Sequence, residues 1–508
     1  MTTSPMVLRS QPGIKRDGTK FDGEFYTDGQ WVRFQRGLPR KIWGYRSVAR
    51  YFAEACRGIA SFTQQGYLYC HYGAMSSLQR FTLDSSGNAS VLSNRTPAGY
   101  TSNADNMWMF DYMYDSSTAA NSVIAHVAPN ATCICGAGAG YIYTGDVLGT
   151  SPLTSVTLPA GANATGGIVV LHPYLFYYGT AGIIGWSVAG TPADLSGSGS
   201  GVARVWGQKI IKGMPLRAGA GSAPAGIFWA YDAVIRASFV GGSTVFQFDV
   251  VATDTSILST NSIVDFDGVY YWAAVDRFMM FSGVVREVPN QLNLNWFFDG
   301  LNTAQRQKVF AFKVPRFGEI WWCYPRGSAT ECTHAVIFNV RENTWYDTQL
   351  PGVGRTAAVF SNAYAAPLLS DAEAYTGGYK TWIHEQGRDA VDGIITNPIP
   401  SWFETADFSM LSKGENSEMR IARIEPDFVQ TGDMEVTVMG RINARAPEVS
   451  GASFTFNATA TSPQEQTVML KEQRREMRVK FYSNSVSGDY QMGQIIAHVG
   501  AADKTVIG

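Results

Sequence analysis

The 508-residue sequence is poor in charged residues, and the two signs nearly cancel. Lys and Arg number 40 against 42 Asp and Glu, which gives a formal net charge of −2. A protein whose whole surface binds a polyanion needs a strongly basic balance, so the composition excludes that class. Any contact with nucleic acid is therefore expected to be local.

Long apolar runs are also missing. The most apolar stretch, residues 168–186, is interrupted by His172-Pro173 and by three glycines, so it does not form a membrane-spanning helix. The first 18 residues, MTTSPMVLRSQPGIKRDG, lack the apolar segment of a secretory leader. We therefore expect no membrane segment and no export by that route.

Only six cysteines occur, and none of them forms a CxxC pair. Cys133 and Cys135 would share one face of a strand and could form half of a metal site, but no second pair and no histidine cluster completes it. Buried, reduced thiols are the favoured interpretation. The sequence also contains no GxxxxGK[ST], HExxH or GxSxG motif, and we expect no cofactor and no metal.

Short runs of β-branched and aromatic residues are abundant, and Gly, Asp and Asn separate them, which is the pattern of an all-β chain. The run at 267–283 has the form of a hairpin, with strands at 269–273 and 278–281 and a turn at 275–277. Seven such runs occur, at 66–73, 140–145, 172–186, 226–242, 267–283, 317–327 and 377–387. Their irregular spacing brackets the roughly 40 to 50 residues of a four-stranded blade, so we predict a β-propeller-like platform.

A chain of this length exceeds the size at which one core stops growing, so we expect several domains. Aromatic residues thin out after NPIP at 397–400, and alternating strands follow at 434–441, 466–472 and 477–484. The predicted order is an N-terminal strand or hairpin arm (1–50), the propeller-like domain (51–400) and a C-terminal β-sandwich (401–508). One short helix is expected at 302–312, after a cap at Asn302 or Thr303.

Residues 28–45, DGQWVRFQRGLPRKIWGY, interleave aromatic and cationic side chains. Bases stack on rings while Lys and Arg neutralise phosphates, so the pattern can indicate a nucleic-acid contact. It also fits a hairpin that turns at Gly37-Leu38-Pro39, with Trp31 and Phe34 packed inward. In that interpretation the cations point outward; they are Arg36, Arg40 and Lys41.

Basic residues cluster in residues 1–50, with ten Lys or Arg against four Asp or Glu, and again at 471–480, with five against two. For both clusters a solvated face is the simpler interpretation, and contact with a partner or with DNA is the alternative.

The carboxylates could instead belong to an active site, because propellers also host glycosidases, which hold two carboxylates about 5 to 10 Å apart across a cleft. The candidates are Asp232, Asp265, Asp267, Asp276 and Glu319, most of them in or beside expected turns, where carboxylates cap backbone amides.

Three regions of the sequence together resemble one family of bacteriophage proteins. They are DGEFYTDGQWVRFQRGLPRKIWGYR at 22–46, FAFKVPRFGEIWWCYPRG and AVIFNVRENTWYDTQLPG at 310–352, and FETADFSM, IARIEPDF and REMRVKFYSNSVSGDYQMGQ between 403 and 494. The order of these aromatic segments along the chain resembles that in the tail nozzle or hub proteins of short-tailed (podovirus-like) phages. These proteins are also described as packaged-DNA stabilisation proteins. The resemblance spans most of the chain.

The resemblance implies a virion protein without enzymatic activity, assembled in the host cytoplasm into a sixfold ring below the portal and the tail adaptor protein. Packaged double-stranded DNA would contact the ring transiently, and a tailspike or tail fibre and a needle protein would attach to it. Structural or partner roles are implied for the matching positions: Trp31, Arg33, Phe34, Gly37, Trp321, Trp322, Tyr324, Pro325, Asn343, Trp345, Tyr346, Arg478, Asn484 and Gly493. Arg40 and Lys41 are further candidate partner positions in the first phrase.

Two other functions stay open at this point. A receptor-binding or spike-anchoring tail protein would hold carbohydrate with exposed aromatic loops, although the sequence shows no fibre-like repeat. A propeller hydrolase acting on host polysaccharide would use the carboxylates named above.

Overall fold

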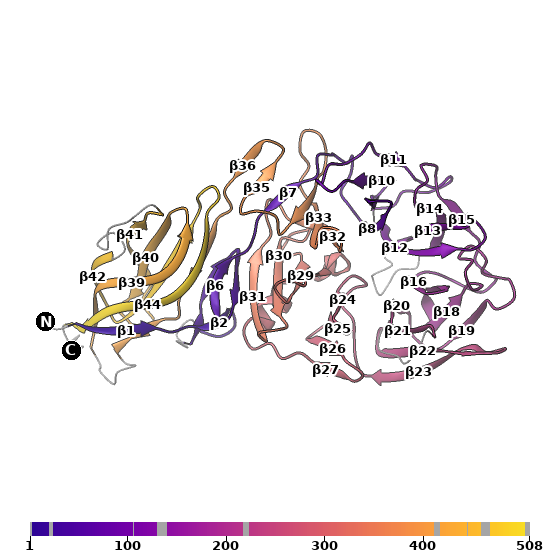
Figure 1. Ribbon diagram of the computed structural model, residues 1–508. Helices are drawn as coiled ribbons and strands as arrows, with labels where there is room; N and C mark the ends of the chain where they lie inside the picture. The colour runs from indigo at the N-terminus through magenta and orange to yellow at the C-terminus, as the bar shows by residue number, and fades with distance from the viewer. Residues whose placement is uncertain are drawn as a thin grey trace.

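The computed structural model describes residues 3–19, 24–104, 106–129, 140–216, 223–410, 417–443, 445–458 and 468–502. Two β-rich bodies lie side by side, a ring of blades and a sandwich of two sheets (Figure 1). The predicted all-β fold class is confirmed, because strands form both bodies and helices only short connections. Within the ranges just given, no helix is long and apolar enough to cross a membrane.

The ring is a β-propeller, to which the described part of the chain contributes seven sheets. The innermost strands are β8 (Gly58–Gln64), β12 (Asn106–Asp115), β16 (Gly167–Leu171), β20 (Ile210–Pro215), β24 (Ile263–Phe266), β28 (Phe310–Val314) and β32 (Arg355–Ser361). Most of these strands contact the inner strand of the next blade, and β32 contacts β8. The ring is therefore closed.

Each blade continues outward through antiparallel neighbours. The second strands are β9 (Tyr67–Gly73), β13 (Ala120–Pro129), β17 (Tyr174–Tyr178), β21 (Ala225–Ala230), β25 (Val269–Ala273), β29 (Glu319–Tyr324) and β33 (Ala366–Asp371). The third strands are β10 (Leu78–Leu83), β14 (Tyr141–Asp146), β18 (Ile183–Trp186), β22 (Ala233–Gly241), β26 (Phe278–Phe281), β30 (His334–Asn339) and β34 (Thr381–His384). The outer strands of the first six blades are β11 (Ser93–Asn94), β15 (Thr154–Val156), β19 (Gly201–Arg204), β23 (Val245–Thr253), β27 (Val285–Glu287) and β31 (Thr344–Gln349).

Each of the seven aromatic runs in the sequence lies in a different blade. The run at 267–283 forms β25 and β26, whose bounds match the predicted strands. The turn before β25 consists of Asp267 and Gly268, both with positive φ (51° and 83°), as a two-residue type I′ hairpin turn requires.

The aromatic side chains of these runs fill the space between blades. Alternate residues of a strand point to opposite faces of its sheet. On β25, Tyr270 and Trp272 pack against Trp229 of the preceding blade, whereas Tyr271 packs against Phe338 of the following blade. A blade therefore buries both of its faces only when the ring is complete.

The last blade takes a strand from the N-terminal segment. Its sheet has the order β32-β33-β34-β7-β35-β36, where β7 is Tyr45–Ser47, β35 is Ala390–Asp392 and β36 is Ile395–Asn397. β7 pairs antiparallel with β34 and parallel with β35. A strand that precedes the first blade is thus enclosed in the sheet of the last blade, which locks the ring.

The second body is a β-sandwich (Figure 1). One sheet has the order β42-β39-β44-β6-β5, with β1 beside β44, and the other has the order β4-β37-β43-β40-β41, with β38 beside β43. Its C-terminal strands are β37 (Ser401–Glu404), β38 (Phe408–Ser409), β39 (Met419–Thr431), β40 (Met434–Arg441), β41 (Val449–Phe456), β42 (Val468–Arg474), β43 (Glu476–Ser483) and β44 (Asp489–Ala501). The strands predicted at 434–441, 466–472 and 477–484 correspond to β40, β42 and β43.

The N-terminal strands are parts of both bodies. β1 (Ser4–Leu8), β4 (Asp28–Gln30), β5 (Val32–Gln35) and β6 (Leu38–Lys41) join the sandwich, while β2 (Gln11–Ile14) and β3 (Phe25–Tyr26) pair with each other. Residues 1–50 are therefore not a separate arm, and residue 50 is not a domain boundary. Local sequence patterns do not reveal this arrangement, because partners such as Gly29 and Phe403 are far apart in the chain.

Helical structure in the described chain is limited to η2 (Thr180–Gly182), α1 (Leu294–Gly300) and η3 (Thr303–Lys308). The helix predicted at 302–312 is present only as η3, capped by the Asn302 side chain, and β28 begins at Phe310. The α1 helix was not predicted. Its cap comes from another part of the chain, because the Asp17 carboxylate accepts hydrogen bonds from the N–H groups of Asn295 and Trp296, both at 2.8 Å.

Candidate functional site at the joint between the two domains

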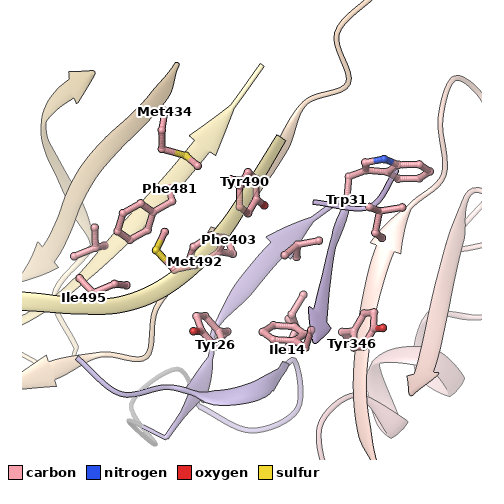
Figure 2. Close-up of a cluster of buried hydrophobic side chains, with 14 of the residues drawn as sticks. Ile14, Tyr26, Trp31, Tyr346, Phe403, Met434, Phe481, Tyr490, Met492 and Ile495 are labelled. Atoms are coloured by element: carbon pink, nitrogen blue, oxygen red, sulfur yellow. The ribbon is translucent and has the colours of Figure 1, made fainter. Parts of the chain in front are cut away.

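The two domains share one buried core where the hairpin of β5 and β6 meets the sixth blade (Figure 2). We call this region the joint; it consists of Trp31, Arg33, Phe34, Glu319, Trp321, Tyr346 and Glu385. Figure 2 shows sandwich side chains such as Phe481 and Tyr490, the N-terminal residues Ile14 and Tyr26, and Tyr346 of the sixth blade in one continuous cluster. The phrases that carry the phage resemblance meet here, although they lie hundreds of residues apart.

Trp31 forms the corner of the joint. It lies between β4, which belongs to one sheet of the sandwich, and β5, which belongs to the other. Its φ of 53° is uncommon for a bulky residue and turns the chain from one sheet to the next. Its N–H donates to Thr348 Oγ1 of the sixth blade (3.0 Å), and its carbonyl accepts from Ser401 Oγ of the sandwich (2.9 Å). One residue is thus tied to both domains.

The indole ring of Trp31 is buried, with 1% of its surface exposed. It meets the rings of Trp321 and Tyr45 edge-on, each at a centroid distance of 6.1 Å. Its Nε1–H donates to the carbonyl oxygen of Trp43 (3.2 Å). The side chain therefore contributes both apolar area and a satisfied polar group, which is how large aromatics stabilise a core.

Arg33 is fully buried between two carboxylates. Its Nε lies 2.8 Å from Glu319 Oε1 and its Nη2 lies 2.5 Å from Glu385 Oε1, while the guanidinium stacks on Phe317 at 3.7 Å. Burial alone would lower the pKa of Arg33, but the two carboxylates reverse the effect and raise it. Arg33 is therefore an ion-paired interior residue of the joint and not a surface cation.

Glu319 makes more polar contacts within the joint than Glu385 does. Besides Arg33, it accepts hydrogen bonds from Trp321 Nε1–H and from the Tyr346 hydroxyl, both at 2.8 Å. Burial raises the pKa of this carboxyl, and Arg33 opposes the shift. Phe34 packs against Tyr346 at 5.4 Å, so the same tyrosine serves the polar and the apolar parts of the joint.

Lys41 corrects the prediction that the cations of the hairpin point outward. Its side chain is 0% exposed, and its Nζ donates to the carbonyl oxygen of Gly488 (2.9 Å). Burial lowers the pKa of Lys41 to about 8, with partial opposition from Asp389 and Asp489. Arg33 and Lys41 are thus both interior groups, whereas Arg36 is exposed and Arg40 half-buried.

The turn of the hairpin is one residue earlier than predicted. Arg36 and Gly37, with φ of 53° and 76°, form a two-residue turn between β5 and β6. Their N–H groups both donate to the Glu342 carboxylate, for Gly37 at 3.0 Å. Asn343, the next residue, is exposed and has a φ of 49° in the neighbouring turn of the sixth blade. Gly37 and Asn343 therefore occupy turn positions.

The structure places the other predicted site residues outside the joint. Trp322 and Trp345 stack at 5.8 Å between the fifth and sixth blades, where each indole N–H donates to a backbone carbonyl at 2.8 Å. Arg478 lies inside the sandwich, paired with Glu404 (2.9 Å), Asp407 (3.3 Å) and Glu448. Burial would lower the pKa of Arg478, but these carboxylates raise it.

The candidate acids of a glycosidase do not form a pair across a cleft in the described chain. Asp265 and Asp267 belong to one tight turn, Asp276 pairs with its neighbour Arg277, and Asp232 accepts from Trp206 Nε1–H (2.6 Å). Glu319 does lie close to a second carboxylate, Glu385, but their side chains are 0% and 8% exposed around Arg33. A sugar chain has no access to them.

Sequence reasoning missed Glu385, Thr348 and Ser401, which complete the joint. Ordinary polar residues in strands and loops give no local signal for such contacts. Cys56, Cys70, Cys323 and Cys332 are buried free thiols, whereas Cys133 and Cys135 lie outside the described residues. The part of the chain with defined structure contains no group of three side chains that could hold a metal ion.

A cavity of about 280 Å³ lies on the axis of the propeller, and all seven inner strands line it. This volume is far too small to hold a segment of duplex DNA, whose major groove alone is roughly 12 Å wide. The cavity of a single propeller is therefore not a passage for duplex DNA.

Comparisons with known proteins identify no family. No family model and no curated protein matches the chain. Among solved structures, the chain is similar to the WD40 β-propeller domain of Doa1 (8% identity, TM-score 0.41) and to the WD40 repeats of RRP9 (9% identity, TM-score 0.42). Each match covers 68% of this chain; the first covers 98% of the Doa1 domain and the second covers 99% of the RRP9 chain. A third solved structure, from Bacteroides uniformis and provisionally described as a 6-phosphogluconolactonase, has 11% identity and a TM-score of 0.38, and the match covers 61% of this chain and 92% of that chain.

Proposed function

We propose that this protein is a structural subunit of the tail nozzle or hub of a short-tailed bacteriophage. The observation that carries the proposal is the joint. Phrases from the beginning, middle and end of the chain carry the resemblance, and their residues pack into one buried interdomain core. A shared sequence signature concentrated in such a core is expected when the fixed arrangement of two domains is the selected property.

The polar interior of the joint supports a mechanical role. Arg33, Glu319, Glu385 and Tyr346 are held together by ion pairs and hydrogen bonds within a space that excludes water. Paired buried charges favour a single arrangement, because any displacement leaves an unpaired buried charge. A rigid two-domain subunit suits a tail part that has to hold its shape while DNA is under pressure above it.

In the proposed assembly the DNA channel lies between subunits. The cavity of about 280 Å³ inside one propeller is too small for a duplex, so a ring of subunits, six by the resemblance, would enclose the lumen. The tail adaptor above the ring and spikes, fibres or a needle at its outer surfaces are the partners that this role entails.

Electron microscopy of virions tests the proposal. The expected result is a closed ring on the tail axis into which the two-domain structure fits. Finding the chain only on peripheral fibres would favour the receptor-binding alternative, and its absence from virions would end the virion proposal. Turnover of host polysaccharide that an acid-to-amide substitution abolishes would favour the hydrolase.

A further inference from the structure

Three arginines lie near one another at the edge of the joint, and two of them stack on Trp43; we call Arg40, Arg316 and Arg388 the arginine cluster. Arg40 comes from β6, Arg316 from the turn between β28 and β29, and Arg388 from the segment between β34 and β35. The guanidinium carbons of Arg316 and Arg388 lie 4.1 and 5.2 Å from the centroid of the Trp43 ring. Sandwich and propeller thus contribute to one site.

The positive charge of the arginine cluster is only partly balanced. Among the described residues, Arg388 has an ion pair, with Asp489 at 2.8 Å, and neither Arg40 nor Arg316 has one. Of the other nearby acids, Glu385 is paired with Arg33, and Asp389 accepts the N–H of Ser487 (2.9 Å) and acts on the buried Lys41. The three arginines therefore have one ion pair among them.

The electrostatic cost of this arrangement is visible at Arg40. Burial lowers the pKa of Arg40, and the guanidinium groups of Arg388, Arg33 and Arg316 lower it further, while Asp489 acts in the opposite direction. Like charges that a fold holds together in this way are stabilised by an added anion.

Hydrogen-bond donors at the cluster are also unused. Arg40 Nε and Trp43 Nε1 are buried and have no hydrogen-bond partner in the described chain. Buried donors without a partner are rare in native proteins, so each calls for a specific explanation. Stacking on Trp43 would account for one ordered arginine as a packing element. It does not account for three cations beside two unused donors.

The basic surface extends beyond the cluster along adjoining turns. The guanidinium of Arg341 donates to the carbonyl oxygens of Pro315 and Arg316 at 2.7 and 2.9 Å, and Arg36 lies at the hairpin turn next to Glu342. Arg36, Arg316 and Arg341 are exposed. Arginines on several adjoining turns fit a polymer with many phosphates better than they fit a single small anion.

We propose that the arginine cluster binds backbone phosphates of nucleic acid. Guanidinium groups recognise phosphate oxygens in bidentate fashion, and the Trp43 ring holds two of them in place before the ligand arrives. The choice of double-stranded DNA as the source of the phosphate rests on the proposed function, while the phosphate site itself does not.

The test is fluorescence anisotropy of a labelled DNA duplex with the purified full-length protein, from 50 to 200 mM salt. The variant Arg40→Gln, Arg316→Gln, Arg388→Gln is compared with Arg204→Gln, Arg236→Gln, Arg277→Gln, which removes the same charge from exposed sites on other blades. The single variant Arg316→Gln guards against misfolding, because this exposed side chain makes no hydrogen bond in the described chain.

The cluster variant is expected to bind duplex at least tenfold more weakly at 50 mM salt, with the slope of log K against log salt reduced by about 2 to 3. The control should stay within about twofold of the parent, because it removes no phosphate contact. Equal binding by parent, cluster variant and control, or no binding by the parent, would overturn the proposal.

Inorganic phosphate separates the two sources of the ligand. If phosphate raises the melting temperature of the parent but not of the cluster variant, and duplex binding is the same in both, DNA is excluded as the source. The outcome is independent of the virion test. If the protein binds DNA through the arginine cluster but never occurs on the tail axis, the phosphate site is supported and the nozzle function is rejected. If the protein forms a ring on the tail axis but does not bind DNA, the nozzle function is supported and the phosphate site is rejected.

Discussion

Replacing Arg33 with alanine is expected to lower the free energy of unfolding by about 3 to 5 kcal/mol at pH 7. The guanidinium lies within 2.8 Å of Glu319 and 2.5 Å of Glu385, in a region without solvent. Its removal leaves two buried carboxylates beside each other without a cation, and the loss of one partner from a buried ion pair has a cost of this size. The stacking contact with Phe317 at 3.7 Å is lost as well.

The cost of Arg33→Ala should depend on pH in a defined direction. Burial already raises the pKa of Glu319, and Arg33 lowers it, so removal of the guanidinium raises that pKa further. The folded variant then binds more protons than the unfolded chain, and its stability increases as the pH falls toward the ordinary range of a carboxyl group. The difference from the parent should therefore be smaller at pH 5 than at pH 7.

Urea unfolding followed by tryptophan fluorescence at both pH values is the assay. The control combines Arg33→Met, Glu319→Gln and Glu385→Gln, which removes all three charges at similar volume and should stay within about 1 to 2 kcal/mol of the parent. The reasoning is refuted if Arg33→Ala lies within about 1 kcal/mol of the parent at pH 7, or if the difference grows on acidification.

Three further changes probe other parts of the same structure. Trp31→Ala should lower the free energy of unfolding by about 3 to 5 kcal/mol in urea titrations, since it empties the corner of the joint; a variant as stable as the parent would contradict the burial. Because burial lowers the pKa of Lys41 to about 8, the parent should gain stability as the pH rises from 8 toward 10.5, and Lys41→Met should lack that gain in thermal melts across this range. Arg46→Pro should open the ring, because β7 is enclosed between β34 and β35 and proline cannot donate to the ladder; limited proteolysis would detect the opening, with Arg46→Ala as the resistant control.

The sequence predicts the repetitive part of this fold well. The run at 267–283 carries its own strand pattern and turn residues, so β25 and β26 are predicted to the residue, and the same holds for β40 at 434–441. These elements are determined by neighbours in the chain, which is what periodicity and turn chemistry report.

The joint could not be predicted in the same way. Arg33 and Lys41 look like surface cations in the sequence, yet their partners lie 286 and 447 residues away, at Glu319 and Gly488. Whether a charged residue is solvated or paired depends on such distant contacts, and composition shows only that acids are available somewhere. The aromatic positions Trp31 and Phe34 were placed correctly in a packed hairpin, because burial follows from their residue type.

The strand β7 has a consequence for the order of events during synthesis. Arg46 is made early but pairs with Ile383, and ribosomes add about 5 to 20 residues per second. The 337 residues from 47 to 383 therefore take roughly 17 to 67 s to appear. During that time β7 lacks both of its partner strands, so the last blade of the propeller cannot form. The sandwich waits longer still, because β44 is made at residues 489–501. A nascent chain of this kind is expected to depend on chaperones that cover unpaired strands, and both domains should become protease-resistant late, the sandwich after the propeller.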